Sequence, residues 1–221
     1  MKYVYLGLLA VVSAIHLIDS YKDDAKKRAH TKGFLLPLIL LYYISSVDTC
    51  SWILAAALIT SWLGDILLIP KGTKWFVSGG ISFLAAHILF IFTYTPRIDF
   101  GRVVWYIAIP AAVIYFTVAG IIIKNILPST PKMMIGPMFA YLIANSTMNV
   151  FALMQLLSFP CAGTAIAYAG AVLFFISDCT LFLVRYHKNK DIVFKRHFMV
   201  MLTYILGELL ITQGSIMLSN L

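Results

Sequence analysis

The sequence predicts an all-α integral membrane protein, a bundle of eight transmembrane helices in a single domain that covers residues 1–221. The chain is 61% hydrophobic and 12% charged, with a mean hydropathy of +0.90, far more apolar than an ordinary soluble domain. Its apolar runs are about 15 to 24 residues long, close to the roughly 20 that a helix needs to cross a hydrocarbon core. They lack the alternation of a membrane β-barrel, so only helices can satisfy backbone polar groups in lipid.

The predicted spans are about residues 3–19, 33–47, 50–69, 78–95, 103–123, 134–158, 162–185 and 197–219. The first has features of a signal peptide, because Lys2 precedes a short apolar run and Val12-Ser13-Ala14 loosely matches a cleavage site. We expect an uncleaved anchor instead, since the basic cluster that follows normally stays in the cytoplasm. The second span is short and contains Pro37, so we expect little tilt, a kink or a locally thinner bilayer.

The basic residues predict the orientation of the bundle. With the N-terminus outside, the first, third, fifth and seventh connections are cytoplasmic and hold 14 of the 17 lysines and arginines, and both termini are non-cytoplasmic. These residues are Lys22, Lys26, Lys27, Arg28, Lys32, Lys71, Lys74, Lys124, Lys132, Arg185, Lys188, Lys190, Lys195 and Arg196. The same asymmetry accounts for the net charge of +8 through attraction to anionic headgroups, so no nucleic-acid partner is expected.

Two aspartates stand inside apolar runs, each after a small residue: Gly64-Asp65 and Ser177-Asp178. A charge at membrane depth is costly, so an intramembrane carboxylate indicates a functional site. At 1.5 Å per residue, the two lie very roughly 8 and 10 Å in from the cytoplasmic ends of their spans. We therefore expect them to share one layer and to form an acid–base pair.

Other polar side chains lie on neighbouring spans. Two of these spans carry a polar stripe at four-residue spacing, and a third carries a histidine near its middle. The residues are Tyr141, Asn145 and Asn149, then Tyr204, Glu208 and Thr212, then His87. Hydrogen bonding between helices is the structural alternative for this set. For Glu208 three roles stay open: a protonated structural carboxyl, a partner of His87, or a third catalytic carboxyl.

The three cysteines indicate no metal site, because they have neither CxxC spacing nor a histidine cluster nearby. Cys50 and Cys161 both fall near the predicted outer face. A disulfide between them is therefore an alternative to the free apolar thiols that we expect.

Several motifs follow one another in order along the chain. They are Thr31-Lys32-Gly33-Phe34-Leu35-Leu36-Pro37, Leu63-Gly64-Asp65, Phe83 to His87, Ala140-Tyr141, Gly170 to Asp178 and Thr203-Tyr204. The ordered set resembles the lysoplasmalogenase family of small multi-pass membrane hydrolases over nearly the whole chain. Its most specific parts are the Gly-Asp and Ser-Asp motifs with Ala-His between them. Glu208 departs from the pattern, because a neutral amide is more usual there.

The resemblance implies hydrolysis of the vinyl ether bond of lysoplasmalogens, 1-alkenyl glycerophosphocholine or glycerophosphoethanolamine, to a fatty aldehyde and the glycerophospho headgroup. No metal or organic cofactor is expected. The expected partners are the lysophospholipid substrate and the surrounding lipid of a bacterial inner membrane or the endoplasmic reticulum; the sequence does not specify an oligomeric state.

The chemistry parallels glycoside hydrolysis, in which one carboxyl donates a proton while its partner stabilises an oxocarbenium ion or activates water. The predicted catalytic residues are Asp65, Asp178 and His87, and the predicted substrate-binding residues are Lys32, Tyr141, Asn145, Tyr204 and Glu208. The order of acid and base stays open. Lys32 would contact the phosphate, helped by Lys74 or Arg196. The alternative is that Lys32 only contributes to the positive charge of the cytoplasmic side. The alkenyl tail would lie between helices and enter from the inner leaflet.

A non-enzymatic lipid-binding protein or a small-solute carrier is the alternative. Gly64-Asp65 and Ser177-Asp178 lie four helices apart, as in a duplicated half, and transporters often place their sites between repeats. A hydrolase should release product from detergent-solubilised protein, whereas a carrier needs a sealed membrane and a gradient.

Overall fold

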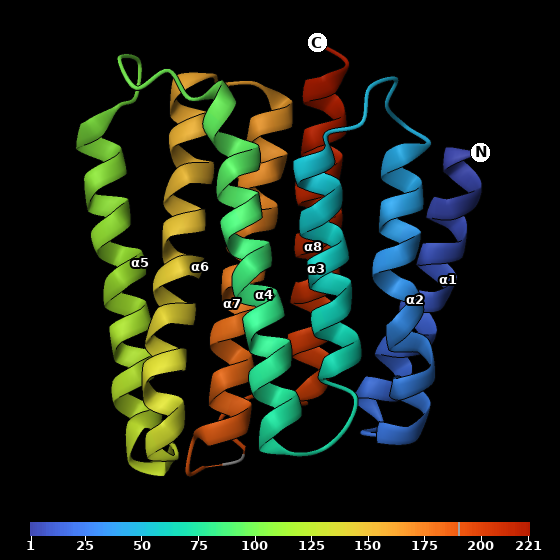
Figure 1. The fold of residues 1–221 in the computed structure, drawn as a ribbon, viewed down its shortest axis with the longest axis vertical. Coiled ribbons are helices and arrows are strands. Elements are labelled where there is room, and N and C mark those ends of the chain that lie inside the picture. The colour runs from blue at the N-terminus through green and yellow to red at the C-terminus, as the bar shows by residue number, and fades with distance from the viewer. Residues whose placement is uncertain (190) are drawn as a thin grey trace.

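The computed structural model describes residues 1–189 and 191–221, and within them the chain is all-helical, with eight α-helices and no strand. Figure 1 shows the helices running along one long axis in alternating directions, so that both termini lie at the same end. The helices are α1 Lys2–Tyr21, α2 Ala25–Ile44, α3 Trp52–Leu67, α4 Thr73–Tyr94, α5 Trp105–Ile126, α6 Lys132–Ser158, α7 Ala162–Tyr186 and α8 His197–Ser219. Lys190, one of the predicted cytoplasmic lysines, falls outside the described residues.

Six of these helices, α1 and α4 to α8, are long and apolar enough to cross a membrane, which makes the chain a multi-pass membrane protein. α3 is apolar but has only 16 residues. The count of eight spans and the side on which the termini lie stay predictions.

The largest difference from the predicted boundaries is in α2, which begins at Ala25 instead of near residue 33. The Asp24 side chain accepts a hydrogen bond from the backbone N–H of Lys27 at 3.1 Å and so caps the helix. Lysine and arginine are good helix formers, so the basic cluster coils into the first turns of α2. Pro37 lies inside the helix and does not end it.

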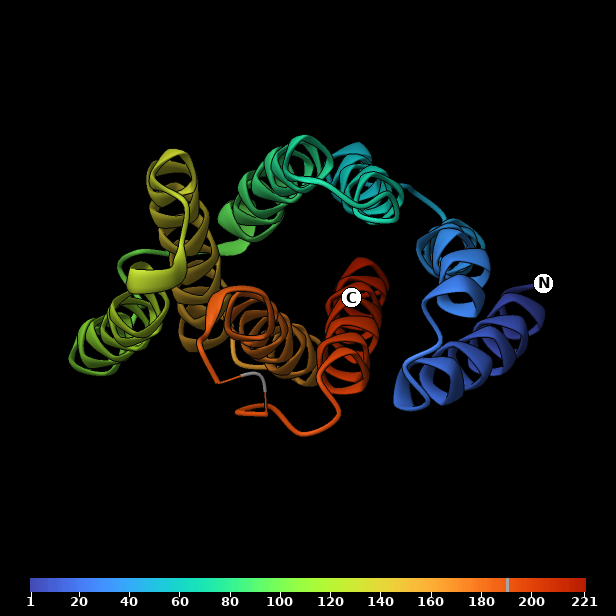
Figure 2. The same cartoon turned by 90° about the horizontal axis from the view of Figure 1, so that it is seen from below.

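Figure 2 shows α3 and α4 facing α7 and α8 across the middle of the bundle, with α1 and α5 at its two ends. Asp65 on α3 and Asp178 on α7 therefore come from opposite sides of the same interior.

Cys50 and Cys161 lie at the end of the bundle where α3 and α7 begin. Both are free thiols, so the alternative of a disulfide is not realised.

Glycines allow the backbones of α7 and α8 to approach each other closely. A Cβ added to Gly170 would lie 2.6 Å from the backbone nitrogen of Ile211 and 2.7 Å from the carbonyl oxygen of Gly207. Small residues serve this purpose in membrane bundles, where close packing drives helix association. The approach also lets the Ser177 hydroxyl on α7 donate to the carbonyl oxygen of Val200 on α8 at 2.9 Å.

This packing predicts that Gly170→Ala lowers the melting temperature of the detergent-solubilised protein, because the added methyl group meets backbone atoms that cannot move aside. We expect a loss of about 1–3 kcal/mol of unfolding free energy. Gly120→Ala on α5 is the matched control, since a Cβ there meets no atom within 4 Å. Equal melting temperatures for the two variants would contradict this account of the interface.

Candidate active site

One cavity of about 170 Å³ lies among α2, α3, α4, α7 and α8, at the end of the bundle where α2 and α8 begin. Both Asp65 and Asp178 line it, although they are 113 positions apart in the chain. Their exposed fractions are only 1% and 4%, so the cavity is the route by which another molecule can reach them. The two carboxylates therefore share a single compartment.

Asp65 is held by a cation and a phenol. The Lys32 ammonium nitrogen lies 3.1 Å from Oδ1 of Asp65, and the Tyr204 hydroxyl donates to Oδ2 at 2.8 Å. Both carboxylate oxygens are thus occupied, and α2, α3 and α8 are tied together at this point. The Lys32 side chain is mostly buried, at 16% exposed, so its charge is directed to the aspartate and not to bulk water.

Asp178 is held differently, mainly by neutral donors from α6. The Tyr141 hydroxyl and the Asn145 side-chain amide both donate to Oδ2 of Asp178, at 2.9 and 2.8 Å. Asn149 donates to the carbonyl and side-chain oxygens of Asn145, which fixes the direction of the Asn145 amide group. Within the described residues Oδ1 makes no hydrogen bond, so this oxygen is left for a molecule in the cavity.

His87 completes the surroundings of Asp178. Its Nδ1 lies 2.7 Å from the carbonyl oxygen of Phe83, and since a carbonyl only accepts, Nδ1 carries a hydrogen. Its Nε2 lies 3.2 Å from Oδ2 of Asp178. Nε2 is therefore the ring nitrogen that faces the carboxyl of Asp178.

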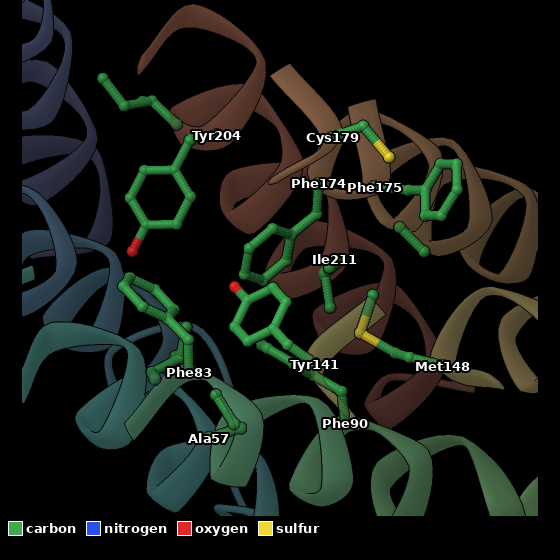
Figure 3. Close-up of a cluster of buried hydrophobic side chains, with 14 of the residues drawn as sticks. Ala57, Phe83, Phe90, Tyr141, Met148, Phe174, Phe175, Cys179, Tyr204 and Ile211 are labelled. Carbon is green, nitrogen blue, oxygen red and sulfur yellow. The ribbon is translucent and has the colours of Figure 1, made fainter. Parts of the chain in front are cut away.

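The small residue before Asp65, Gly64, is required by the packing of a neighbouring aromatic ring. At Gly64 an added Cβ would lie 2.6 Å from the ring of Phe83, so the glycine makes room for that ring. Phe83 in turn packs edge-on against Phe174 and Tyr204, with ring centroids 6.4 and 5.8 Å apart (Figure 3). These rings form an apolar wall beside the carboxylates.

Not every predicted binding residue reaches the cavity. Lys32 and Tyr204 line it, whereas Asn145 and His87 contact Asp178 and are not among the lining residues. Glu208 is fully buried and is not among the lining residues, so its predicted contact with substrate stays a prediction that this cavity does not support. Its pairing with His87 is also absent, because the histidine faces Asp178.

Glu208 lies deeper in the bundle than the two aspartates. Neither of its oxygens makes a hydrogen bond in the described part of the chain, and the unbonded hydroxyl of Ser61 is its neighbour. A buried carboxyl with so few partners is most simply accommodated as a neutral structural group.

The sequence analysis missed two residues at the mouth of the cavity, Arg185 and His197. Arg185 lies seven positions after Asp178, and His197 lies seven positions before Tyr204, and both partners were predicted site residues. A spacing of seven places each pair on one face of its helix. The guanidinium carbon of Arg185 lies 3.7 Å from the ring centroid of Phe76. The helpers expected for Lys32 do not line the cavity: Lys74 is exposed, and Arg196 pairs with Asp191 at 3.3 Å.

The ion pair predicts non-additive effects on stability. Lys32→Met leaves the Asp65 carboxylate buried without its cation, which should lower the unfolding free energy by about 1–3 kcal/mol. The double variant with Asp65→Asn should regain much of this loss, because no charge then remains unpaired. Thermal unfolding of the two single variants and the double variant in detergent measures the coupling; strictly additive changes would show that the pair does not stabilise the bundle.

Comparison with known families assigns most of the chain to one family. A model of the YhhN family matches residues 27–215, a range that includes Lys32, both aspartates and every other residue named around them. No curated protein and no solved structure matches the chain. Because the match covers most of its length, the chain belongs to the YhhN family, which includes lysoplasmalogenases.

Proposed function

We propose that the protein is a lysoplasmalogenase, an ether hydrolase that cleaves the vinyl ether of 1-alkenyl glycerophosphocholine or glycerophosphoethanolamine. The observation that carries the proposal is the single buried cavity lined by two carboxylates with unlike partners. Membership of a family that includes lysoplasmalogenases supports it.

The unlike partners suggest which carboxyl is the acid. We assign the proton of the resting site to Oδ1 of Asp178, the oxygen that accepts no hydrogen bond from the described residues, while His87 faces Oδ2. From there it is transferred to the outer alkene carbon of the vinyl ether, which leaves an oxocarbenium ion. Asp65, paired with Lys32, serves as the carboxylate that faces this cation and accepts a proton from the attacking water.

The second half of the reaction restores both carboxyls. Water adds to the oxocarbenium carbon and gives a hemiacetal, with its released proton on Asp65. The hemiacetal then collapses: its hydroxyl proton returns to Asp178, and the proton on Asp65 is transferred to the departing glycerol oxygen. One water is consumed, the products are a fatty aldehyde and the glycerophospho headgroup, and both side chains return to their starting states.

The phosphate contact follows from the mouth of the cavity. Arg185 and His197 both line the mouth of the cavity, so we assign the phosphate mainly to Arg185, with His197 beside it. A guanidinium is suited to this role because it can present two parallel donors to a phosphate.

The assignment of the carboxyls predicts that Asp65→Asn and Asp178→Asn each lower the rate of aldehyde release by at least about a hundredfold, since each loses a proton-transfer group. Aldehyde formed from a purified lysoplasmalogen by detergent-solubilised protein is the measurement. Asp99→Asn is the control, because Asp99 is exposed and pairs with Arg102 outside the cavity. Wild-type rates in either site variant would refute the assignment.

The same assay separates the hydrolase from a lipid-binding protein or carrier. A hydrolase releases aldehyde without a sealed membrane or a gradient, whereas a carrier forms no aldehyde under any condition.

A further inference from the structure

We propose that an apolar groove between α4 and α6 binds the hydrocarbon tail of the substrate. This inference rests on the proposed function and specifies a subsite for the tail. The groove is lined by α4, α6 and α7, and apart from Tyr141 every lining residue is apolar. Gly80 and Leu84 lie on its α4 side, and Met134 and Met138 on its α6 side.

The groove adjoins the carboxylate cavity. Four residues line both spaces: Leu68, Phe76, Phe83 and Leu181. A molecule that occupies both must therefore be an amphiphile, with its polar part beside the carboxylates and Arg185 and its apolar part between α4 and α6.

Tyr141 marks the junction between the two spaces. Its side chain lines the groove, while its hydroxyl donates to Asp178 at 2.9 Å. The vinyl ether of a lysoplasmalogen is likewise the bond that joins the polar glycerol to the hydrocarbon chain. A tail in the groove would thus place the scissile bond next to the proposed acid.

The groove opens to the lipid-facing surface. Ile81, one of its lining residues, is 61% exposed, on a helix that has the length and composition of a membrane span. A tail can therefore enter sideways from the bilayer and need not leave the hydrocarbon phase, which avoids the cost of exposing it to water.

Gly80 offers a direct way to test the groove. It lines the groove, yet a Cβ added there meets no atom within 4 Å. A side chain at this position would start in open space beside the groove and would fill space that the tail needs. Gly120 on α5 is a matched control, because it is also open around its Cβ, lies at a similar distance from the same end of the bundle and does not line the groove.

The first experiment compares Gly80→Phe and Gly120→Phe on two vinyl ethers with the same glycerophosphoethanolamine headgroup, one with a long alkenyl chain and one butenyl analogue. Gly80→Phe should lower kcat/KM for the long chain by at least about tenfold while leaving the butenyl analogue nearly unchanged. Gly120→Phe should change neither. Equal effects of Gly80→Phe on both substrates, or no effect on either, would overturn the proposal.

A second experiment does not depend on catalysis. A lysophosphatidylethanolamine with an ester-linked tail that ends in a diazirine is photo-crosslinked to the protein in detergent, and the labelled peptides are mapped. Crosslinks should fall on α4 and α6 and be lost in Gly80→Phe but kept in Gly120→Phe. If no substrate yields aldehyde yet this pattern appears, the hydrolase proposal fails and the tail groove stands. Crosslinks confined to α1 and α8, or unchanged by Gly80→Phe, would exclude the groove.

Discussion

The structure depends on how two carboxylates are compensated inside an apolar bundle. A buried charge or carboxyl in a membrane needs partners from neighbouring helices, since neither lipid nor bulk water can supply them. Asp65 on α3 takes its partners from α2 and α8, and Asp178 on α7 takes its partners from α4 and α6. Between them, the two aspartates connect all six helices that surround the interior. The interactions that offset the cost of burial are thus also the ones that set the positions of these helices around the site.

The two carboxylates are buried to a similar degree but have different surroundings, and this difference is what the proposed chemistry requires. Asp65 faces a permanent cation, whereas Asp178 faces a phenol, an amide and a histidine whose other nitrogen is committed to a carbonyl. Cleavage of a vinyl ether needs one group that gives a proton to carbon and another that remains as an anion near the cation formed.

The apolar surroundings are part of the same site. Phe83 lies in the wall between the carboxylate cavity and the groove, and Gly64 allows it to stand there. Tyr141 joins the groove to Asp178 by its ring and its hydroxyl. The boundary between polar and apolar surfaces in the protein therefore coincides with the boundary between headgroup and tail in the proposed substrate, so that recognition of the lipid and placement of its scissile bond use the same residues.

The sequence by itself determined the helical membrane architecture and pointed to Asp65 and Asp178 as candidate site residues, because the cost of a carboxylate in an apolar run is a local property. It also indicated the stripe of Tyr141 and Asn145, since helical periodicity puts residues four apart on one face. Only the tertiary structure decided that Lys32 pairs with Asp65, that His87 faces Asp178 and not Glu208, and that Arg185 stands at the mouth. These outcomes depend on how each helix is rotated and shifted against its neighbours, which the packing of glycines and aromatic rings sets and which no single helix encodes.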